Sequence, residues 1–303
     1  MDAVKKRRKF RTSPALIILC VVLVLYTISF LLPMVWMLIT SFKDYKTYMM
    51  ATIWEDLDLM LNFEKMTTHN YEVAFNNFSI PTVAKPEGVF LFEMVFNSIL
   101  YAGGCALIAT IVPCFMSYLV ARYDYFFGKI VYAIVLVTMA IPIVGSLPSE
   151  IKMVETLGLM DSVIGLYILK ANFLGLYFLV FHAQFKMIPK DYTEAAEIDG
   201  ASDWFIMTRI IFPIASGTIS TVILLNFIYF WNDYQIPMIY WEPRPVVAYG
   251  MYYVVRRTSG KDGSSSTPVK LATMVIVALP ILVLFSIFNR KIMSNMSIGG
   301  VKG

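Results

Sequence analysis

The sequence has few of the residues on which catalysis, metal binding or covalent cross-linking depends. It contains two histidines and three cysteines among 303 residues. His69 and His182 are far apart in the sequence, and Cys20, Cys105 and Cys114 all fall within apolar runs, where thiols pack as small apolar groups. Neither a Gly-Lys-Ser/Thr phosphate loop nor a Gly-x-Ser-x-Gly nucleophile motif occurs. We therefore expect no catalytic residues, no metal site and no cofactor on this chain.

Charge is also scarce. Charged residues make up 15% of the chain and hydrophobic residues 58%, with a mean hydropathy of +0.67. A membrane-spanning helix needs about 20 mostly apolar residues. Six such segments occur along the sequence, at about 15–42, 94–121, 130–149, 170–187, 214–238 and 271–289. We therefore expect an all-α integral membrane protein with six transmembrane helices and no room for a large soluble domain.

The third and fourth spans carry interruptions. Pro142 and Pro148 flank Gly145 near the outer end of the third span, and such residues open or bend a membrane helix. Lys170 interrupts the fourth apolar stretch. We expect a short interfacial helix at Asp161–Leu169, followed by a span from about Lys170 to Met187.

The positions of Lys and Arg predict how the chain is oriented in the membrane. Segment 1–14 is basic, and Arg290, Lys291 and Lys302 follow the last span, so we expect both termini to be cytoplasmic in a multi-pass protein of a bacterial plasma membrane. We attribute the N-terminal charge to topology and lipid contact rather than to nucleic-acid binding. The apolar run that follows is too long for a cleaved signal peptide. Arg122, at the end of the second span, is interpreted as a side chain that snorkels to the membrane boundary.

The segment between the fourth and fifth spans, 188–213, carries the most informative local pattern. Asp191 with Glu194 three residues later predicts a helix N-cap and its capping-box partner. Gly200 suits the position just beyond the end of that helix. Ser202 can cap a second short helix, which we expect to end before Pro213. The sequence therefore predicts a helix–turn–helix hairpin.

One face of the first predicted helix is small in the middle, because Tyr192, Ala195, Ala196 and Asp199 lie at positions i, i+3, i+4 and i+7. Such a face lets another surface approach closely. The alternatives are an ordinary capped loop and a DNA-binding helix–turn–helix. The second is disfavoured because Lys190 and Arg209 are outnumbered by carboxylates, the wrong balance for phosphate binding. Those carboxylates are Asp191, Glu194, Glu197, Asp199 and Asp203.

The spacing EAA-x3-G-x9-I-x-F-P in this segment resembles the EAA loop of ABC importer permeases, with Phe212 where that family has Leu. The resemblance implies that the loop docks a separate ATPase, to which ATP and Mg bind. The coupling residues that it implies are Glu194, Ala195, Ala196, Asp199, Gly200 and Pro213.

Two further segments resemble the carbohydrate branch of the same family. Trp231-Asn232-Asp233 is similar to a WN-acidic signature that follows the EAA loop there. The end of the chain, Gly299–Gly303, is similar to the tail of the smaller permease of the maltose transporter. Rings beside amides and carboxylates are what sugar binding needs, although an interfacial aromatic belt is the favoured interpretation, because Trp and Tyr collect at membrane interfaces. The candidate translocation-path residues are Asn226, Tyr229, Trp231, Asn232 and Asp233.

The resemblance implies the type I ABC importer permease fold and one membrane subunit of a sugar importer. The expected partners are a second permease subunit, two ATPase subunits, an extracellular solute-binding protein, membrane lipid and the sugar itself. An importer for peptides or amino acids, a secondary transporter and a polytopic membrane enzyme are the alternatives. The long acidic outer loop, 43–90, either covers the outer face and touches an external partner or is an ordinary solvated loop.

Overall fold

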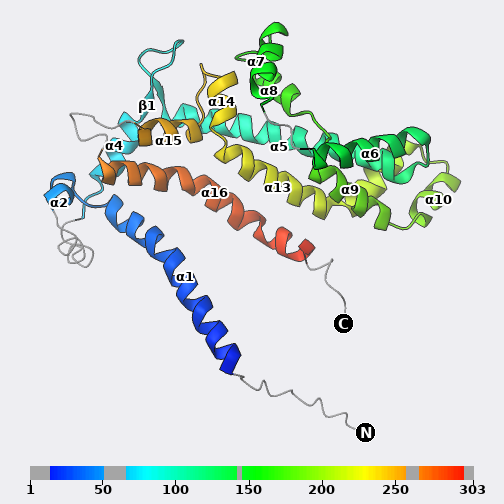
Figure 1. Ribbon diagram of the computed structural model, residues 1–303, viewed down its shortest axis with the longest axis horizontal. Coiled ribbons are helices and arrows are strands. Elements are labelled where there is room, and N and C mark those ends of the chain that lie inside the picture. Colours follow the sequence, from blue (N-terminus) through cyan, green and yellow to red (C-terminus); the bar gives the residue numbers. More distant parts are fainter. Residues whose placement is uncertain (1–13, 51–65, 142–144, 257–265, 297–303) are drawn as a thin grey trace. The chain divides into compact units, whose positions relative to one another are not determined.

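The computed structural model describes residues 14–50, 66–141, 145–256 and 266–296 (Figure 1). The basic residues 1–13 and the tail Gly299–Gly303 lie outside this part of the chain. The contacts divide the chain into two units, Met1–Ala74 with Ser259–Val275 and Phe75–Thr258 with Ile276–Gly303. Each unit is described separately below.

The first unit begins with a long apolar helix, α1 (Pro14–Ser41), whose side chains are exposed along most of its length. An apolar helix without a protein neighbour is typical of a segment solvated by lipid. Its end is tied to the chain that follows, because the Asn70 amide donates hydrogen bonds to the carbonyl oxygens of Ser41 (2.8 Å) and Lys43 (2.7 Å). The expected first span is confirmed as a helix. Two short helices come after it in the sequence, α2 (Tyr45–Met50) and α4 (His69–Asn77).

The second unit is built around α5 (Leu91–Arg122), which packs along α9 (Leu176–Met187) and α13 (Ser216–Asn232) (Figure 1). Small buried residues on α5, including Ala102 and Ala106, let neighbouring helices approach closely. This unit also contains β1 (Ser79–Ile80), β2 (Val89–Phe90), α6 (Phe126–Ala140), α7 (Leu147–Thr156), α8 (Val163–Lys170), α14 (Gln235–Tyr240) and α15 (Val247–Arg256), and the hairpin described below. The last helix, α16 (Thr267–Met296), starts in the first unit and continues into the second from Ile276 onward.

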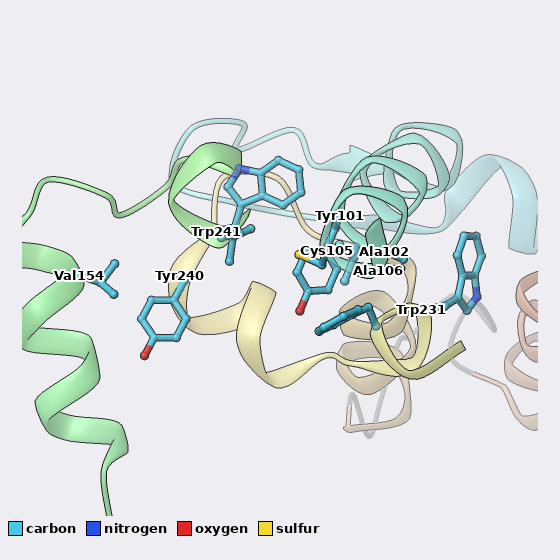
Figure 2. Close-up of a cluster of buried hydrophobic side chains, with 11 residues drawn as sticks. Tyr101, Ala102, Cys105, Ala106, Val154, Trp231, Tyr240 and Trp241 are labelled. Carbon is cyan, nitrogen blue, oxygen red and sulfur yellow. The ribbon is translucent and has the colours of Figure 1, made fainter. Parts of the chain in front are cut away.

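A cluster of buried aromatic and small side chains is built on the first half of α5 (Figure 2). Tyr101 and Cys105 of α5 belong to it together with Trp231, at the end of α13, and Tyr240 and Trp241, which close α14. The Tyr240 hydroxyl also donates to the Glu150 carboxylate of α7, at 3.0 Å. This cluster fixes the short helices α7 and α14 against the long helices of the unit.

The third and fourth predicted spans differ from the structure. Helix α6 ends at Ala140, Gly145 adopts a left-handed φ of +81°, and α7 starts as a new helix, so the span 130–149 is broken. Pro142 lies outside the described residues. Lys170 ends α8 rather than starting the fourth span, which begins at Leu176 after Gly175, with φ +155°. The break expected in the third span is confirmed, and the short helix expected at Asp161–Leu169 is present as α8. The fourth span starts at Leu176 rather than at Lys170.

The fifth predicted span, 214–238, is also two helices rather than one. Helix α13 ends at Asn232, and the Asp233 carboxylate accepts hydrogen bonds from the backbone N–H groups of Gln235 (3.0 Å) and Ile236 (3.3 Å). A short acidic side chain that bonds the backbone ahead of it favours a turn over a continuous helix. Asp233 therefore ends one helix and starts the next.

Within the described residues, α1 and α5 are long and apolar enough to cross a membrane. A third crossing is present if Asp203–Ile214 and Ser216–Asn232, which are bent by 75°, count as one span. The fold is mostly helical, as expected. The all-α expectation is wrong in one detail, because β1 and β2 form a two-residue antiparallel pairing within the predicted outer loop.

Candidate functional site

The predicted hairpin is present, and its first helix is α10 (Asp191–Ile198). Its end is closed by two backbone hydrogen bonds, from Gly200 N–H to the Glu197 carbonyl (3.0 Å) and from Ala201 N–H to the Ala196 carbonyl (2.9 Å). Gly200 has φ +78°. This pair of bonds with a left-handed residue is the Schellman motif, in which glycine avoids the strain that a side chain introduces. The predicted role of Gly200 in the turn is confirmed.

The predicted N-cap of this helix is wrong. Asp191 is already the first helical residue, and the residue at the cap position, Lys190, makes no side-chain capping bond. The carboxylates of Asp191 and Glu194 instead lie in the first helical turn. There the two negative charges interact favourably with the positive end of the helix dipole, although no capping box forms.

The second arm of the hairpin starts as predicted but extends further. The Ser202 hydroxyl accepts a hydrogen bond from Phe205 N–H at 3.4 Å and caps α11 (Asp203–Phe205). The helix then continues through the π-helix η2 (Ile206–Ile211) and α12 (Phe212–Ile214). Pro213 lies in the first turn of α12, where its missing N–H breaks no helical bond. The expectation that this helix stops before Pro213 is therefore wrong.

A groove of about 520 Å³ lies along α10. The small face predicted from the sequence forms it, since Tyr192, Ala195, Ala196 and Asp199 all line it together with Pro189, Asp191 and Ile210. Ala195 is exposed and Ala196 is buried beneath it. Ile198, near the turn, is 87% exposed. The groove and this exposed apolar side chain form a surface that can accept another protein. Glu194, Gly200 and Pro213 do not line the groove.

The hairpin is held to the end of α5 by Arg122, which sequence reasoning assigned to the membrane boundary. Its guanidinium donates hydrogen bonds to the Ile188 carbonyl (2.9 Å), the Pro189 carbonyl (3.3 Å) and the Thr193 hydroxyl (2.9 Å). The planar fork of arginine suits several acceptors at once. Arg122 is thus a positioning residue that joins the second predicted span to the start of α10.

Aromatic rings reinforce this attachment. Tyr118 of α5 meets Phe185 of α9 at 5.6 Å between ring centroids and Phe212 of α12 at 5.9 Å, both edge to face. Such pairs add about 0.5–1.5 kcal/mol each to the free energy of burial. Burial, the neighbouring Tyr118 hydroxyl and the Asp203 carboxylate raise the pKa of Tyr123, so its phenol stays protonated. The hairpin is therefore packed against two long helices.

The five candidate path residues do not share one surface. Asn226 is buried and its amide donates to the Thr110 hydroxyl of α5 at 2.9 Å. Asp233 accepts a hydrogen bond from the Tyr101 hydroxyl at 2.8 Å, and Trp231 is buried. These three residues bind α13 to the rest of the unit.

The other two candidates face away from this interface. Tyr229 is 66% exposed. Asn232 is exposed, and its amide donates to the Ile228 carbonyl one turn earlier, at 2.8 Å. They lie three residues apart on one helix, so they share a face. Of the predicted set, Tyr229 and Asn232 are the two exposed residues.

Residues 109–297 match the family described as "Binding-protein-dependent transport system inner membrane component". Among curated proteins, the diacetylchitobiose uptake system permease protein NgcG of Streptomyces coelicolor is 23% identical, over 91% of this chain and 86% of its own. The melibiose/raffinose/stachyose import permease protein MelC of Bacillus subtilis is 27% identical, over 77% of this chain and 82% of its own. The crystal structure of a bacterial ABC transporter involved in the import of the acidic polysaccharide alginate includes a chain with the same fold. Its TM-score is 0.73 at 20% identity, over 90% of this chain and 95% of that one.

We expect Arg122→Gln to loosen α10. A hydrogen bond to a charged group contributes about 1.5–3 kcal/mol, so amide hydrogen exchange across α10 should accelerate about tenfold or more. Arg122→Lys keeps the charge but not the fork and should show an intermediate effect. Arg209→Gln removes an exposed cation from η2 and serves as the control. Unchanged exchange in Arg122→Gln contradicts the attachment.

Proposed function

The chain belongs to the family of binding-protein-dependent transport system inner membrane components, and from this we infer that it is the permease subunit of an ABC-type carbohydrate importer. The relatives that it matches along most of their length import sugars and oligosaccharides by name. The observation that carries the inference is the groove on α10, at the position of the EAA pattern. The family consists of transport components rather than enzymes.

We place ATP hydrolysis on separate subunits, because the sequence has no phosphate-binding loop of its own. The groove on α10 is the surface that we assign to one ATPase subunit, with the coupling residues Glu194, Ala195, Ala196, Asp199, Gly200 and Pro213. Force applied to α10 passes through Arg122 to α5, and through the rings of Tyr118 and Phe185 to α9. Such an attachment lets closure of the ATPase pair move the spans as rigid bodies.

The complete importer that we propose has a second permease subunit, two ATPase subunits and an extracellular solute-binding protein. This protein delivers sugar to the outer face, and access to the path then alternates between the two sides of the membrane. We further propose six spans, with both termini in the cytoplasm. The contact of Arg122 with Ile188 and Thr193 supports this topology, because it requires the loop after the second span and the hairpin to lie on one side.

Blocking the groove tests the assignment of the ATPase contact. Ala195→Trp fills the groove from an exposed position, so α10 should still fold, while co-purification with the ATPase and transport-coupled ATP hydrolysis should fall tenfold or more. Glu197→Trp places the same side chain at another exposed position of α10, outside the groove, and should retain both. Normal ATPase binding by Ala195→Trp would contradict the assignment of the groove to the ATPase contact.

Cysteine labelling tests the topology, in a background in which Cys20, Cys105 and Cys114 are replaced by alanine. Ser202 and Thr267 are both exposed, the first in the hairpin and the second at the start of α16. A membrane-impermeant maleimide added to intact cells should label Thr267→Cys but not Ser202→Cys. Both should react once the membrane is opened. Labelling of Ser202→Cys from outside refutes the six-span arrangement.

The outer end of α13 yields a prediction about the translocation path. The transported sugar is first identified with a panel of labelled melibiose, raffinose and maltose. Tyr229→Ala and Asn232→Ala should then each weaken uptake of that sugar. Loss of one stacking or hydrogen-bond contact costs about 1–3 kcal/mol, or roughly ten- to hundredfold in affinity. Tyr229→Phe keeps the ring and should retain most uptake. Normal uptake in both alanine variants assigns these side chains to an interfacial aromatic belt and the sugar contacts to the second permease.

A further inference from the structure

A second cavity, of about 460 Å³, lies beside the hairpin but is separate from the groove on α10. It is formed where the end of α5 meets the start of α6 and the end of α9. Its lining combines aromatic side chains, among them Tyr125 and Tyr132, with an unusual concentration of basic ones. The proposed coupling mechanism uses one residue of its lining, Arg122, but assigns no role to the cavity itself.

The positive charge in this cavity is poorly compensated. Four side chains that carry a full positive charge line it, against one carboxylate, that of Asp124. The Lys129 ammonium lies 3.8 Å from that carboxylate, but both side chains are largely exposed, so the pair contributes little. Lys186 and Lys190 form no ion pair with any described residue. The four cations are Arg122, Lys129, Lys186 and Lys190.

Arg122 adds a further observation. Its three hydrogen bonds all go to neutral oxygens, the carbonyls of Ile188 and Pro189 and the hydroxyl of Thr193, so no carboxylate balances its charge there. Its Nε atom is buried and lacks a hydrogen-bond partner among the described residues. A buried, unpaired donor costs free energy, and an anion close to the guanidinium compensates its positive charge.

An apolar surface continues from the cavity along the start of α6. Phe126 is 73% exposed, Phe127 is 70% exposed and Ile130 is 39% exposed. In a chain that spans a membrane, such a surface faces acyl chains. A basic recess beside an acyl-facing surface on the cytoplasmic side is the arrangement that holds an anionic lipid headgroup.

We propose that this cavity binds the phosphate group of an anionic phospholipid from the cytoplasmic leaflet. The proposal rests on the membrane orientation given above. Free inorganic phosphate shares the same chemistry, but the exposed rings of α6 favour the lipid. Since Arg122 lines the cavity and also holds α10, a bound lipid stiffens the attachment of the hairpin to α5.

Native mass spectrometry of the full chain in mild detergent tests the proposal. The probes are dioleoylphosphatidylglycerol, dioleoylphosphatidylcholine and inorganic phosphate. We expect the wild-type protein to retain the glycerol lipid over the choline lipid, and Lys129→Gln with Lys186→Gln to weaken that retention about tenfold or more. Lys152→Gln with Arg209→Gln removes the same net charge from exposed positions outside the cavity and should leave retention unchanged.

Equal retention of the two lipids by the wild-type chain overturns the proposal, as does unchanged retention in the cavity variant. Binding of inorganic phosphate without any preference for the glycerol lipid overturns the lipid assignment. The Ala195→Trp variant separates this site from the coupling groove, because it should lose ATPase coupling and still retain the lipid. A failure of the lipid test therefore leaves the proposed transport function intact.

Discussion

Polar groups inside an apolar helical bundle must be satisfied by the protein itself, because a hydrocarbon surrounding offers no partner for them. In this chain that constraint determines which helices lie together. The Asn226 amide meets the Thr110 hydroxyl, and the Tyr101 hydroxyl meets the Asp233 carboxylate, so α13 is joined to α5 at two levels. The same constraint acts at the end of α5, where the two terminal nitrogens of Arg122 donate to the backbone carbonyls that lead into the hairpin. The polar contacts thus fix the register of a bundle that apolar packing alone leaves undefined.

The features that the sequence predicted correctly are those set by a few neighbouring residues. Gly200 closes α10 and Ser202 caps α11, because each role depends on backbone geometry within one helical turn. The small face of α10 follows from helical periodicity alone, and the structure shows it lining the groove. The long apolar helices α1 and α5 likewise follow from composition.

The failures occur where distant segments decide the outcome. From local sequence alone, Pro213 predicts the end of a helix. In the structure a π-helix precedes it, and proline lies in the first turn of the helix that follows. Packing of Phe212 against Tyr118 stabilises that turn. The sequence predicts Arg122 to be a cation at the membrane boundary. Its true acceptors could not be recognised, because they lie more than 60 positions further along the chain. Helices α7 and α15 were not expected from the sequence, and the contact of Tyr240 with Glu150 shows how a distant partner fixes where α7 packs. Sequence reasoning had no access to these long-range partners.

In the run Trp231-Asn232-Asp233, the two outer residues have structural roles and the middle one is a candidate for contact with the solute. Trp231 is buried in the cluster of Figure 2, and Asp233 both binds Tyr101 and caps α14, so the two flanking residues have structural roles that explain their presence. Asn232 has no such role, because its amide bonds to the carbonyl one turn earlier in its own helix and its side chain is exposed. The two flanking residues fix the end of α13, and with it the direction in which Asn232 and Tyr229 are presented. A rigid frame around an otherwise uncommitted polar side chain is what selective contact with a hydroxyl-rich solute requires, since preorganisation lowers the entropy lost on binding.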